Sequence, residues 1–186
     1  MPRERRLQLA AIVMERLFDA VPDIAGETIG FYWPIKGELD MREFIATCLM
    51  AGAKAAALPV IVEKNKPVEF RTWSPDCAMT TGFWNIPIPA NGEPVQPTIL
   101  LVPLVGFDLH CYRLGYGGGY YDRTLAASSP QPLAIGVGYE FSSLPSIFPQ
   151  RHDIAMDVIV TETTLRWRES AAIDSVRPAL MRGRRR

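Results

Sequence analysis

The residues with the clearest chemical meaning lie in one glycine-rich stretch in the second half of the chain. Residues 113–123 read Arg-Leu-Gly-Tyr-Gly-Gly-Gly-Tyr-Tyr-Asp-Arg. Glycines let a ligand approach the backbone N–H groups closely, because no Cβ stands in the way. Such a loop at the start of a helix offers free N–H donors and the positive end of the helix dipole, and both favour phosphate. The stretch therefore predicts an anion-binding loop, with a tight structural turn as the alternative.

The loop differs from two common nucleotide-binding patterns. A P-loop ends in Gly-Lys-Ser or Gly-Lys-Thr, and residues 113–123 contain no lysine. A dinucleotide-binding loop that begins at Gly115 needs a glycine five residues later, where this chain has Tyr120. If the loop binds phosphate, it does so by another arrangement.

Charged side chains flank the loop and add to its chemistry. Arg113 and Arg123 carry planar, permanently charged donors that suit phosphate oxygens. Asp122 is a hard carboxylate, and Mg²⁺ bound to phosphate groups is commonly held by one or two such carboxylates. Asp157, directly before an expected buried strand, is a second such candidate. The alternatives are that Asp122 pairs with Arg123 or caps the helix, and that Asp157 is a turn residue.

The elements that must position these residues follow from the spacing of the apolar side chains. Helical spacing predicts an amphipathic helix over residues 4–20, a second helix capped by Asp40 and running to about residue 50, and a third over residues 120–127. Apolar runs predict strands over residues 28–33, 58–62, 68–73, 98–102, 133–137 and 158–161. Five prolines predict a long surface loop over residues 74–97.

This alternation of strands and helices predicts an α/β fold. We expect a single-domain, three-layer α/β/α sandwich with a mostly parallel sheet, since 186 residues make about one domain. The domain is placed at residues 1–169. The arginine-rich tail at residues 170–186 is expected to be disordered, a nucleic-acid-binding or partner-binding tail being the alternative.

Composition excludes several classes of protein. Twenty Lys and Arg residues balance twenty Asp and Glu residues, so no global field attracts nucleic acid or an acidic membrane. Three cysteines without a Cys-x-x-Cys pair, and two histidines outside ligand spacing, disfavour a disulfide framework and a zinc site. The longest uncharged apolar run, residues 98–107, is about half of what a bilayer span needs, and no signal peptide is recognisable. We therefore expect a cytoplasmic monomer that binds neither nucleic acid nor membrane.

The sequence as a whole resembles the 5-formyltetrahydrofolate cyclo-ligase family, also called methenyltetrahydrofolate synthetases. The resemblance runs from about residue 4 to residue 165, and the glycine-rich loop is its most specific part. The stretches that carry it are residues 31–34 with 37–38, residues 106–108 with 113–123, residues 135–139 and residues 152–162. The resemblance implies an ATP- and Mg²⁺-dependent ligase that converts 5-formyltetrahydrofolate to 5,10-methenyltetrahydrofolate. In this reaction the N5-formyl oxygen is phosphorylated, and ADP and phosphate are released.

The resemblance also implies roles for individual residues. Arg113 and Tyr121 would be catalytic, Asp122 and Asp157 would hold magnesium, and Glu38 would bind the polar side of the pterin. Residues in the glycine-rich loop would bind the nucleotide, namely Arg113, Leu114, Gly115, Tyr116, Gly117, Gly118, Gly119, Tyr120 and Tyr121. Of these, Tyr116, Gly117, Gly118, Gly119 and Tyr120 would also face the folate.

The chain departs from the family pattern in two places. Family members carry an N-terminal segment with a Lys and an Arg that reach the ATP phosphates, whereas here the match begins near residue 4, with three arginines in the first six residues. Cys111-Tyr112 stands where the family commonly has a glycine.

The first departure leaves a second function open: a catalytically impaired folate- or nucleotide-binding relative that lacks those ATP-contacting cations. A phosphosugar isomerase or acyl-transfer enzyme on a similar scaffold is disfavoured, because no base and nucleophile are suitably paired. RNA binding through the tail is disfavoured by the neutral body of the chain.

Overall fold

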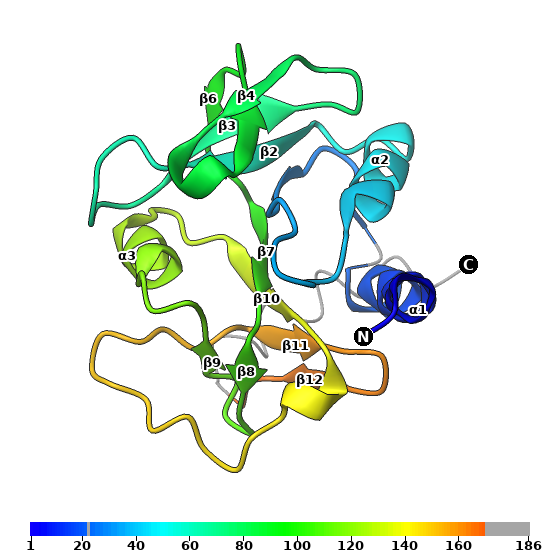
Figure 1. Cartoon of the computed structure of the whole chain (residues 1–186), viewed down its shortest axis with the longest axis vertical. Helices are drawn as coiled ribbons and strands as arrows, with labels where there is room; N and C mark the ends of the chain where they lie inside the picture. The colour runs from blue at the N-terminus through cyan, green and yellow to red at the C-terminus, as the bar shows by residue number, and fades with distance from the viewer. Residues whose placement is uncertain (22, 170–186) are drawn as a thin grey trace.

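The computed structural model describes residues 1–21 and 23–169, and Figure 1 shows their arrangement. The tail predicted at residues 170–186 lies outside the described residues. The centre of the molecule is an eight-stranded sheet with the strand order β12-β11-β10-β7-β1-β2-β3-β6. Its strands are β1 (Thr28–Gly30), β2 (Ala55–Val60), β3 (Glu69–Trp73), β6 (Pro94–Val95), β7 (Ile99–Pro103), β10 (Leu133–Val137), β11 (Val158–Val160) and β12 (Leu165–Trp167).

The middle of this sheet is parallel and its two edges are antiparallel. Strands β11, β10, β7, β1 and β2 pair in parallel, with Ile29 opposite both Ile99 and Ala56. Strand β12 closes one edge antiparallel to β11, while β3 and β6 close the other edge beyond β2. The prediction of a mostly parallel sheet is confirmed.

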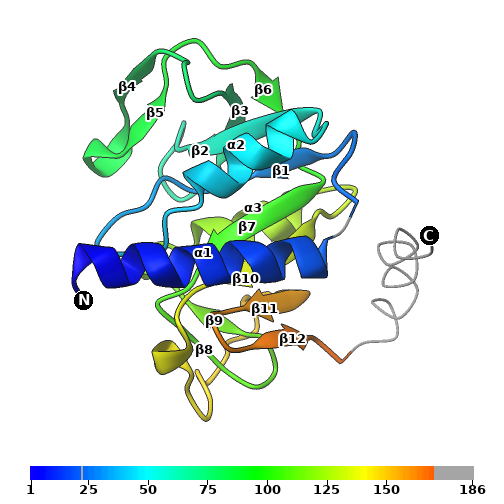
Figure 2. The ribbon, with the colours of Figure 1, turned by 90° about the vertical axis from the view of Figure 1, so that its right-hand side faces the viewer.

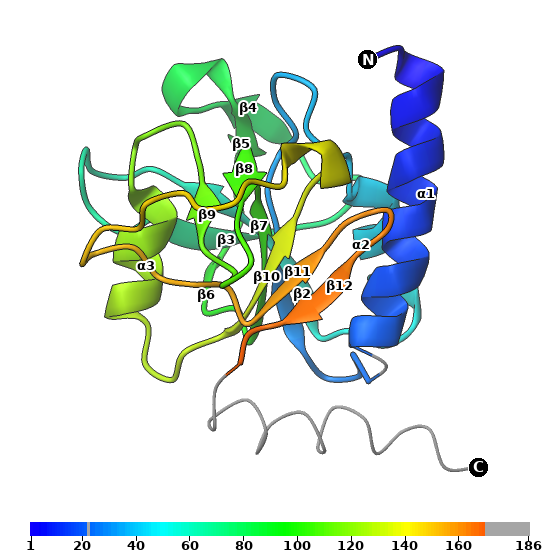
Figure 3. The same ribbon diagram turned by 90° about the horizontal axis from the view of Figure 1, so that it is seen from below.

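Helices cover both faces of the sheet. Helices α1 (Arg3–Ala20) and α2 (Arg42–Met50) lie on one face, and α3 (Tyr120–Ala127) lies on the other (Figure 1). Figure 2 shows α1 crossing in front of the sheet, and Figure 3 shows the same three layers from below. The structure thus has the expected three-layer α/β/α architecture. No helix within the described residues is long and apolar enough to cross a membrane.

The core consists of one hydrophobic cluster on each side of the sheet, and β7 contributes to both. Ile99 and Leu101 belong to the cluster under α1 and α2, whereas Leu100 and Val102 belong to the cluster under α3. Successive side chains of a strand point to opposite faces, so a strand covered on both faces must be apolar at every position. This explains why β7 has an unbroken apolar sequence.

The prediction of a long loop over residues 74–97 is wrong in part. It contains strands β4 (Met79–Thr81) and β5 (Pro87–Pro89), which form an antiparallel hairpin, together with the edge strand β6. The hairpin tip carries the short 3-10 helix η1 (Phe83–Asn85). Prolines are tolerated here because these strands lie at edges, where their missing N–H groups need no partner. Strand β12 is a further element that the sequence analysis did not predict.

Two short strands connect the sheet to the glycine-rich loop. After β7, strands β8 (Gly106–Phe107) and β9 (Arg113–Leu114) pair antiparallel. The loop then leads directly into α3, which begins at Tyr120 as predicted. A second 3-10 helix, η2 (Glu140–Ser142), follows β10.

Candidate active site

A pocket of about 770 Å³ opens at the carboxyl ends of the parallel strands. Tyr32 and Trp33 follow β1, Ile61 follows β2, and Val105 follows β7 in its wall. The glycine-rich loop, the tip of the β4–β5 hairpin and residues 152–153 complete the lining. Loops at this edge of a parallel sheet commonly form the binding site of an α/β protein.

The glycine-rich loop presents bare backbone to this pocket. Gly117 and Gly119 have positive φ angles of 81° and 61°, which side-chain-bearing residues rarely adopt. A Cβ atom added at Gly115 or Gly117 would meet nothing within 4 Å, so a ligand has room to approach the backbone. Among the hydrogen bonds of the described residues, none is donated by an N–H group of residues 115–119. These features support the anion-binding interpretation over the tight structural turn.

Arg113 and Asp122 form a buried ion pair beside this loop. Their two hydrogen bonds measure 2.9 Å (Nη1 to Oδ1) and 3.2 Å (Nη2 to Oδ2). The two side chains are 6% and 12% exposed, so the pair lies largely out of water. Asp122 Oδ1 also accepts the N–H group of Ile154 at 3.1 Å. Asp122 therefore pairs with Arg113 rather than with Arg123, whose guanidinium donates to the Gly118 carbonyl and stacks 5.0 Å from the Tyr120 ring.

Glu38 reaches the same pocket from the turn that follows β1. Its Oε2 accepts the N–H group of Ile35 at 2.8 Å. Burial raises the pKa of this carboxyl from 4.5 to about 7, although the hydrogen bond from Ile35 and the charge of Lys36 both lower it. Burial, and then the charge of Glu38, raise the pKa of Tyr121. Glu38 is thus a carboxyl with one protein hydrogen bond, facing a ligand-sized space.

Aromatic side chains of the hairpin tip form an apolar wall of the pocket. Trp84 meets the ring of Tyr120 edge-on at 5.7 Å and the ring of Phe83 at 5.4 Å. Trp84 is 62% exposed and has a positive φ of 55°, so the tip holds a large indole at the mouth of the pocket. Sequence reasoning missed these residues, although an aromatic pair inside a proline-rich stretch was the available signal.

One more contact in the pocket comes from the turn that carries Glu38. The Lys36 ammonium lies 4.6 Å from the centroid of the Tyr116 ring, and Tyr116 is 50% exposed. The backbone of Lys36 is left-handed, with φ 49°, and Gly37 follows with φ 90°. The contact between Lys36 and Tyr116 joins the turn that carries Glu38 to the glycine-rich loop.

The structure does not bring the two predicted magnesium ligands together. Asp157 directly precedes β11, at the amino ends of the parallel strands, and does not line the pocket. Its carboxylate accepts the N–H group of Ala134 at 2.9 Å and pairs with Arg168 at 2.8 Å. Asp153, four residues earlier, lines the pocket together with Asp122. In this structure the Asp157 carboxylate holds the start of β10 and the residue after β12.

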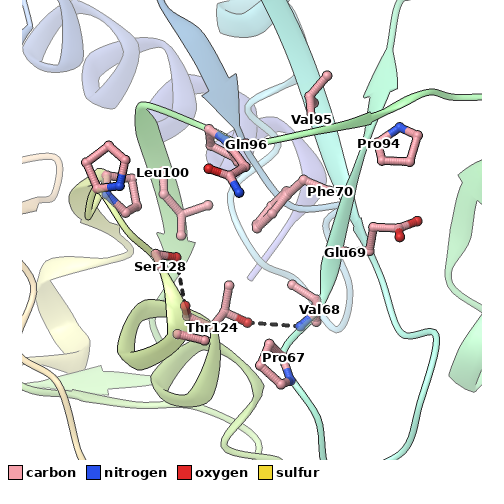
Figure 4. Close-up of a pocket in the computed structure, with 14 residues that line it drawn as sticks. Pro67, Val68, Glu69, Phe70, Pro94, Val95, Gln96, Leu100, Thr124 and Ser128 are labelled. Carbon is pink, nitrogen blue, oxygen red and sulfur yellow. Dashed lines mark hydrogen bonds between the residues drawn. The ribbon is translucent and has the colours of Figure 1, made fainter.

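A second, smaller cavity of about 450 Å³ lies between α3 and the edge strands β3 and β6 (Figure 4). Its wall is rich in proline, and it contains none of the residues predicted as site residues. Two hydrogen bonds at its floor are drawn in Figure 4: Thr124 Oγ1 accepts the Val68 N–H at 3.0 Å, and Ser128 Oγ donates to the Thr124 carbonyl at 2.7 Å. The hydrogen bond from Val68 to Thr124 ties α3 to the residue before β3 at this cavity.

A glycine-rich loop with free N–H groups and an aromatic wall, at the carboxyl ends of parallel strands, are typical of α/β enzymes that act on anionic small molecules. Comparison with known proteins makes this more specific. The model of the 5-formyltetrahydrofolate cyclo-ligase family matches residues 1–162, and the chain belongs to that family.

Individual relatives and solved structures agree with this assignment. The 5-formyltetrahydrofolate cyclo-ligase of Mycoplasma pneumoniae is 30% identical over 136 residues, which cover 73% of each chain. That of Escherichia coli K12 is 27% identical over 167 residues, covering 85% of this chain and 90% of the relative. The NMR structure of the Aquifex aeolicus 5,10-methenyltetrahydrofolate synthetase superposes with a TM-score of 0.77 at 31% identity, covering 92% of this chain and 87% of that one. The M. pneumoniae synthetase structure gives 0.70 at 25% identity, covering 87% and 90%.

Proposed function

We propose that this protein converts 5-formyltetrahydrofolate and ATP into 5,10-methenyltetrahydrofolate, ADP and phosphate, with the help of Mg²⁺. The observation that carries the proposal is that one pocket joins three features: the free N–H groups of residues 115–119, the Glu38 carboxyl and the Trp84 wall. A phosphate chain and a flat, polar-edged ring system need these three features in one place. Membership of the family supports the same reaction.

The chemistry explains why ATP is needed. The N5-formyl group is an amide, so its carbon is a weak electrophile and its oxygen leaves poorly. Transfer of the γ-phosphoryl group to that oxygen forms an iminium phosphate and releases ADP. N10 then attacks the formyl carbon, and the former formyl oxygen departs within inorganic phosphate. Both steps need in-line positioning and positive charge more than covalent help from the protein.

The residues of the pocket divide this work between them. The N–H groups of residues 115–119 bind phosphate oxygens, with Arg113 and Tyr121 beside them at the reacting end. Glu38 accepts N–H groups of the pterin, and Tyr116 to Tyr120 face the same ring system. Trp84 packs against the flat face of the ring and excludes water.

The residues present also fit a magnesium ion. Mg²⁺ at nucleotide sites is commonly held by one or two carboxylates together with phosphate oxygens. Asp122 and Asp153 line the pocket and supply such carboxylates, whereas Asp157 does not line it. When bound, the ion would neutralise negative charge on the phosphates. Arg113 orients Asp122 for this role through its two hydrogen bonds.

Turnover of the purified protein tests the proposal. With 5-formyltetrahydrofolate, ATP and Mg²⁺ we expect the absorbance of methenyltetrahydrofolate to rise, with one phosphate released per product and no rise without ATP. If the protein binds 5-formyltetrahydrofolate but releases neither product, it is a catalytically impaired relative. If it binds neither ATP nor folate, the proposal fails.

A further inference from the structure

Lys36 lies in a hydrogen-bonded turn, and its side chain contacts the glycine-rich loop. The turn is closed by two hydrogen bonds between the same pair of residues, from the Glu38 N–H to the Ile35 carbonyl at 2.9 Å and from the Ile35 N–H to Glu38 Oε2 at 2.8 Å. The left-handed backbone of Lys36 between them directs its side chain to the ring of Tyr116. Because Tyr116 lies between Gly115 and Gly117, this contact brings a positive charge to a side chain of the same loop whose N–H groups are unbonded.

The other cations of the site are already engaged. Arg113 gives two hydrogen bonds to Asp122, and Arg123 is turned towards the Gly118 carbonyl and the Tyr120 ring. By contrast, the Lys36 ammonium forms no ion pair and no side-chain hydrogen bond with a carboxylate within residues 1–21 and 23–169. Lys36 is the lysine of the pocket lining, where its ammonium contacts the Tyr116 ring and its charge also acts on the Glu38 carboxyl.

The charge of the pocket makes this lysine significant. Three carboxyl groups line the pocket, those of Glu38, Asp122 and Asp153, against the two permanent cations Lys36 and Arg113. A polyphosphate entering such a space meets a carboxyl excess unless one cation is free to bind it. An exposed cation–π contact is weaker than a charge-assisted hydrogen bond to phosphate, so Lys36 can exchange Tyr116 for an anion.

We propose that Lys36 leaves the Tyr116 ring and binds the terminal phosphate oxygens of the nucleotide held by the glycine-rich loop. This inference rests on the proposed function, since it names a further phosphate-binding residue of the same site. The ammonium suits the task because its compact charge on a flexible stem can follow an oxygen as the phosphoryl group moves. A different anion, the carboxylate tail of the folate, is the main competing ligand.

Steady-state kinetics of the full-length protein separate these ligands. We expect Lys36→Ala to lower kcat/KM for ATP about tenfold or more, the loss typical of one hydrogen bond to a charged group, and to change the KM for 5-formyltetrahydrofolate less than twofold. Lys36→Arg should restore most of the loss because it keeps the charge. Lys66→Ala, in the exposed turn between β2 and β3, is the matched control and should behave as wild type. A raised KM for folate with an unchanged KM for ATP would overturn the proposal in favour of the carboxylate tail.

A second variant tests whether Lys36 acts on phosphate or merely supports Tyr116. If phosphate is its working partner, Lys36→Ala should cause a similar loss in wild type and in a Tyr116→Leu background. If the lysine only holds the ring, the double variant should be no worse than Tyr116→Leu alone, and the proposal falls.

Direct binding of inorganic tripolyphosphate distinguishes a failure of this inference from a failure of the proposed function. Calorimetric titration without folate should show binding to wild type that weakens in Lys36→Ala and at higher salt. Equal affinity of both proteins would remove Lys36 from the phosphate site while leaving the proposed function intact. No binding to wild type, together with no turnover, would overturn both.

Discussion

At the scale of single residues, Glu38 shows how position gives an ordinary side chain an unusual chemistry. Its carboxyl accepts one backbone hydrogen bond, from Ile35, and burial raises its pKa to about 7. A carboxyl in this condition changes its charge near neutral pH, whereas an exposed one is already ionised well below it. The same burial that prepares Glu38 to accept polar groups of a ligand therefore costs stability in the empty protein.

This cost predicts a dependence of stability on pH. Between about pH 4.5 and pH 7 folded Glu38 keeps a proton that the unfolded chain releases. The free energy of unfolding should therefore fall as the pH rises through this window. Glu38→Gln should remove that part of the slope. Urea denaturation at several pH values between 4.5 and 8 measures it, with the exposed Glu43→Gln on α2 as the control. An unchanged slope in Glu38→Gln would show that another group causes the pH dependence.

The sequence analysis named most of the residues that line the pocket, but it chose an aspartate that does not line it. The glycine-rich loop, Glu38 and Asp122 were all predicted, and the pocket contains them. The segment at residues 152–157 offers two aspartates, and choosing between them requires knowing that β11 begins at residue 158. Asp157 therefore lies at the amino end of a parallel strand, on the opposite edge from the ligand. The sequence analysis had placed a strand over residues 158–161 in a mostly parallel sheet, so the position of Asp157 at its amino end could have been inferred from the sequence.

At the scale of elements, α3 connects the glycine-rich loop to the edge of the sheet. The helix begins at the loop, and its Thr124 hydroxyl donates to the Tyr120 carbonyl at 2.7 Å and accepts the Val68 N–H at 3.0 Å. Thr124 is 6% exposed, so this link is shielded from water. The first turn of α3, which frames the loop, is thereby fixed to the chain just before β3.

Removing the Thr124 hydroxyl should lower the stability of the protein with little change in the shape of the side chain. Thr124→Val keeps the volume of the side chain but leaves the Val68 N–H without its acceptor. We expect the free energy of unfolding to fall by about 1–3 kcal/mol. Thr124→Ser, which keeps the hydroxyl, should retain more of it. Urea denaturation of both variants tests this, and equal losses would show that the methyl group, not the hydrogen bond, holds the helix.

Elements with a strong period were predictable, and elements at the edges of the sheet were not. The start of α3 and both ends of β10 agree with the prediction to the residue, because Gly119 precedes the helix and Pro132 and Gly138 flank the strand. The β4–β5 hairpin was taken for a loop, since prolines at positions 87 and 89 break the usual pattern of a strand. Strand β12 has three half-buried residues, and its pairing with β11 depends on the tertiary fold.

At the scale of the whole molecule, the described residues form one hydrophobic core on each side of the sheet. The cluster under α1 and α2 extends from Leu9 on α1 to Trp167 on β12, which packs against it. The cluster under α3 is built from residues between these limits. We therefore propose that residues 1–169 form the folding domain.

Truncation tests the domain limit directly. A chain ending at residue 169 should unfold in one transition, within about 0.5 kcal/mol of the full-length protein, because no side chain of either cluster is removed. A chain ending at residue 162 is the matched comparison, since it loses β12 and the packing of Leu165 and Trp167 against the core. The free energy of unfolding of this 162-residue chain should be lower by several kcal/mol. A large apolar side chain contributes about 1.5–3 kcal/mol when fully buried, and the two side chains that are lost are half-buried. Urea denaturation followed by tryptophan fluorescence and circular dichroism measures both. If the 169-residue chain is as unstable as the 162-residue chain, the folding domain must extend beyond residue 169. The two hydrophobic clusters would then not be enough to hold β11 and β12 in place.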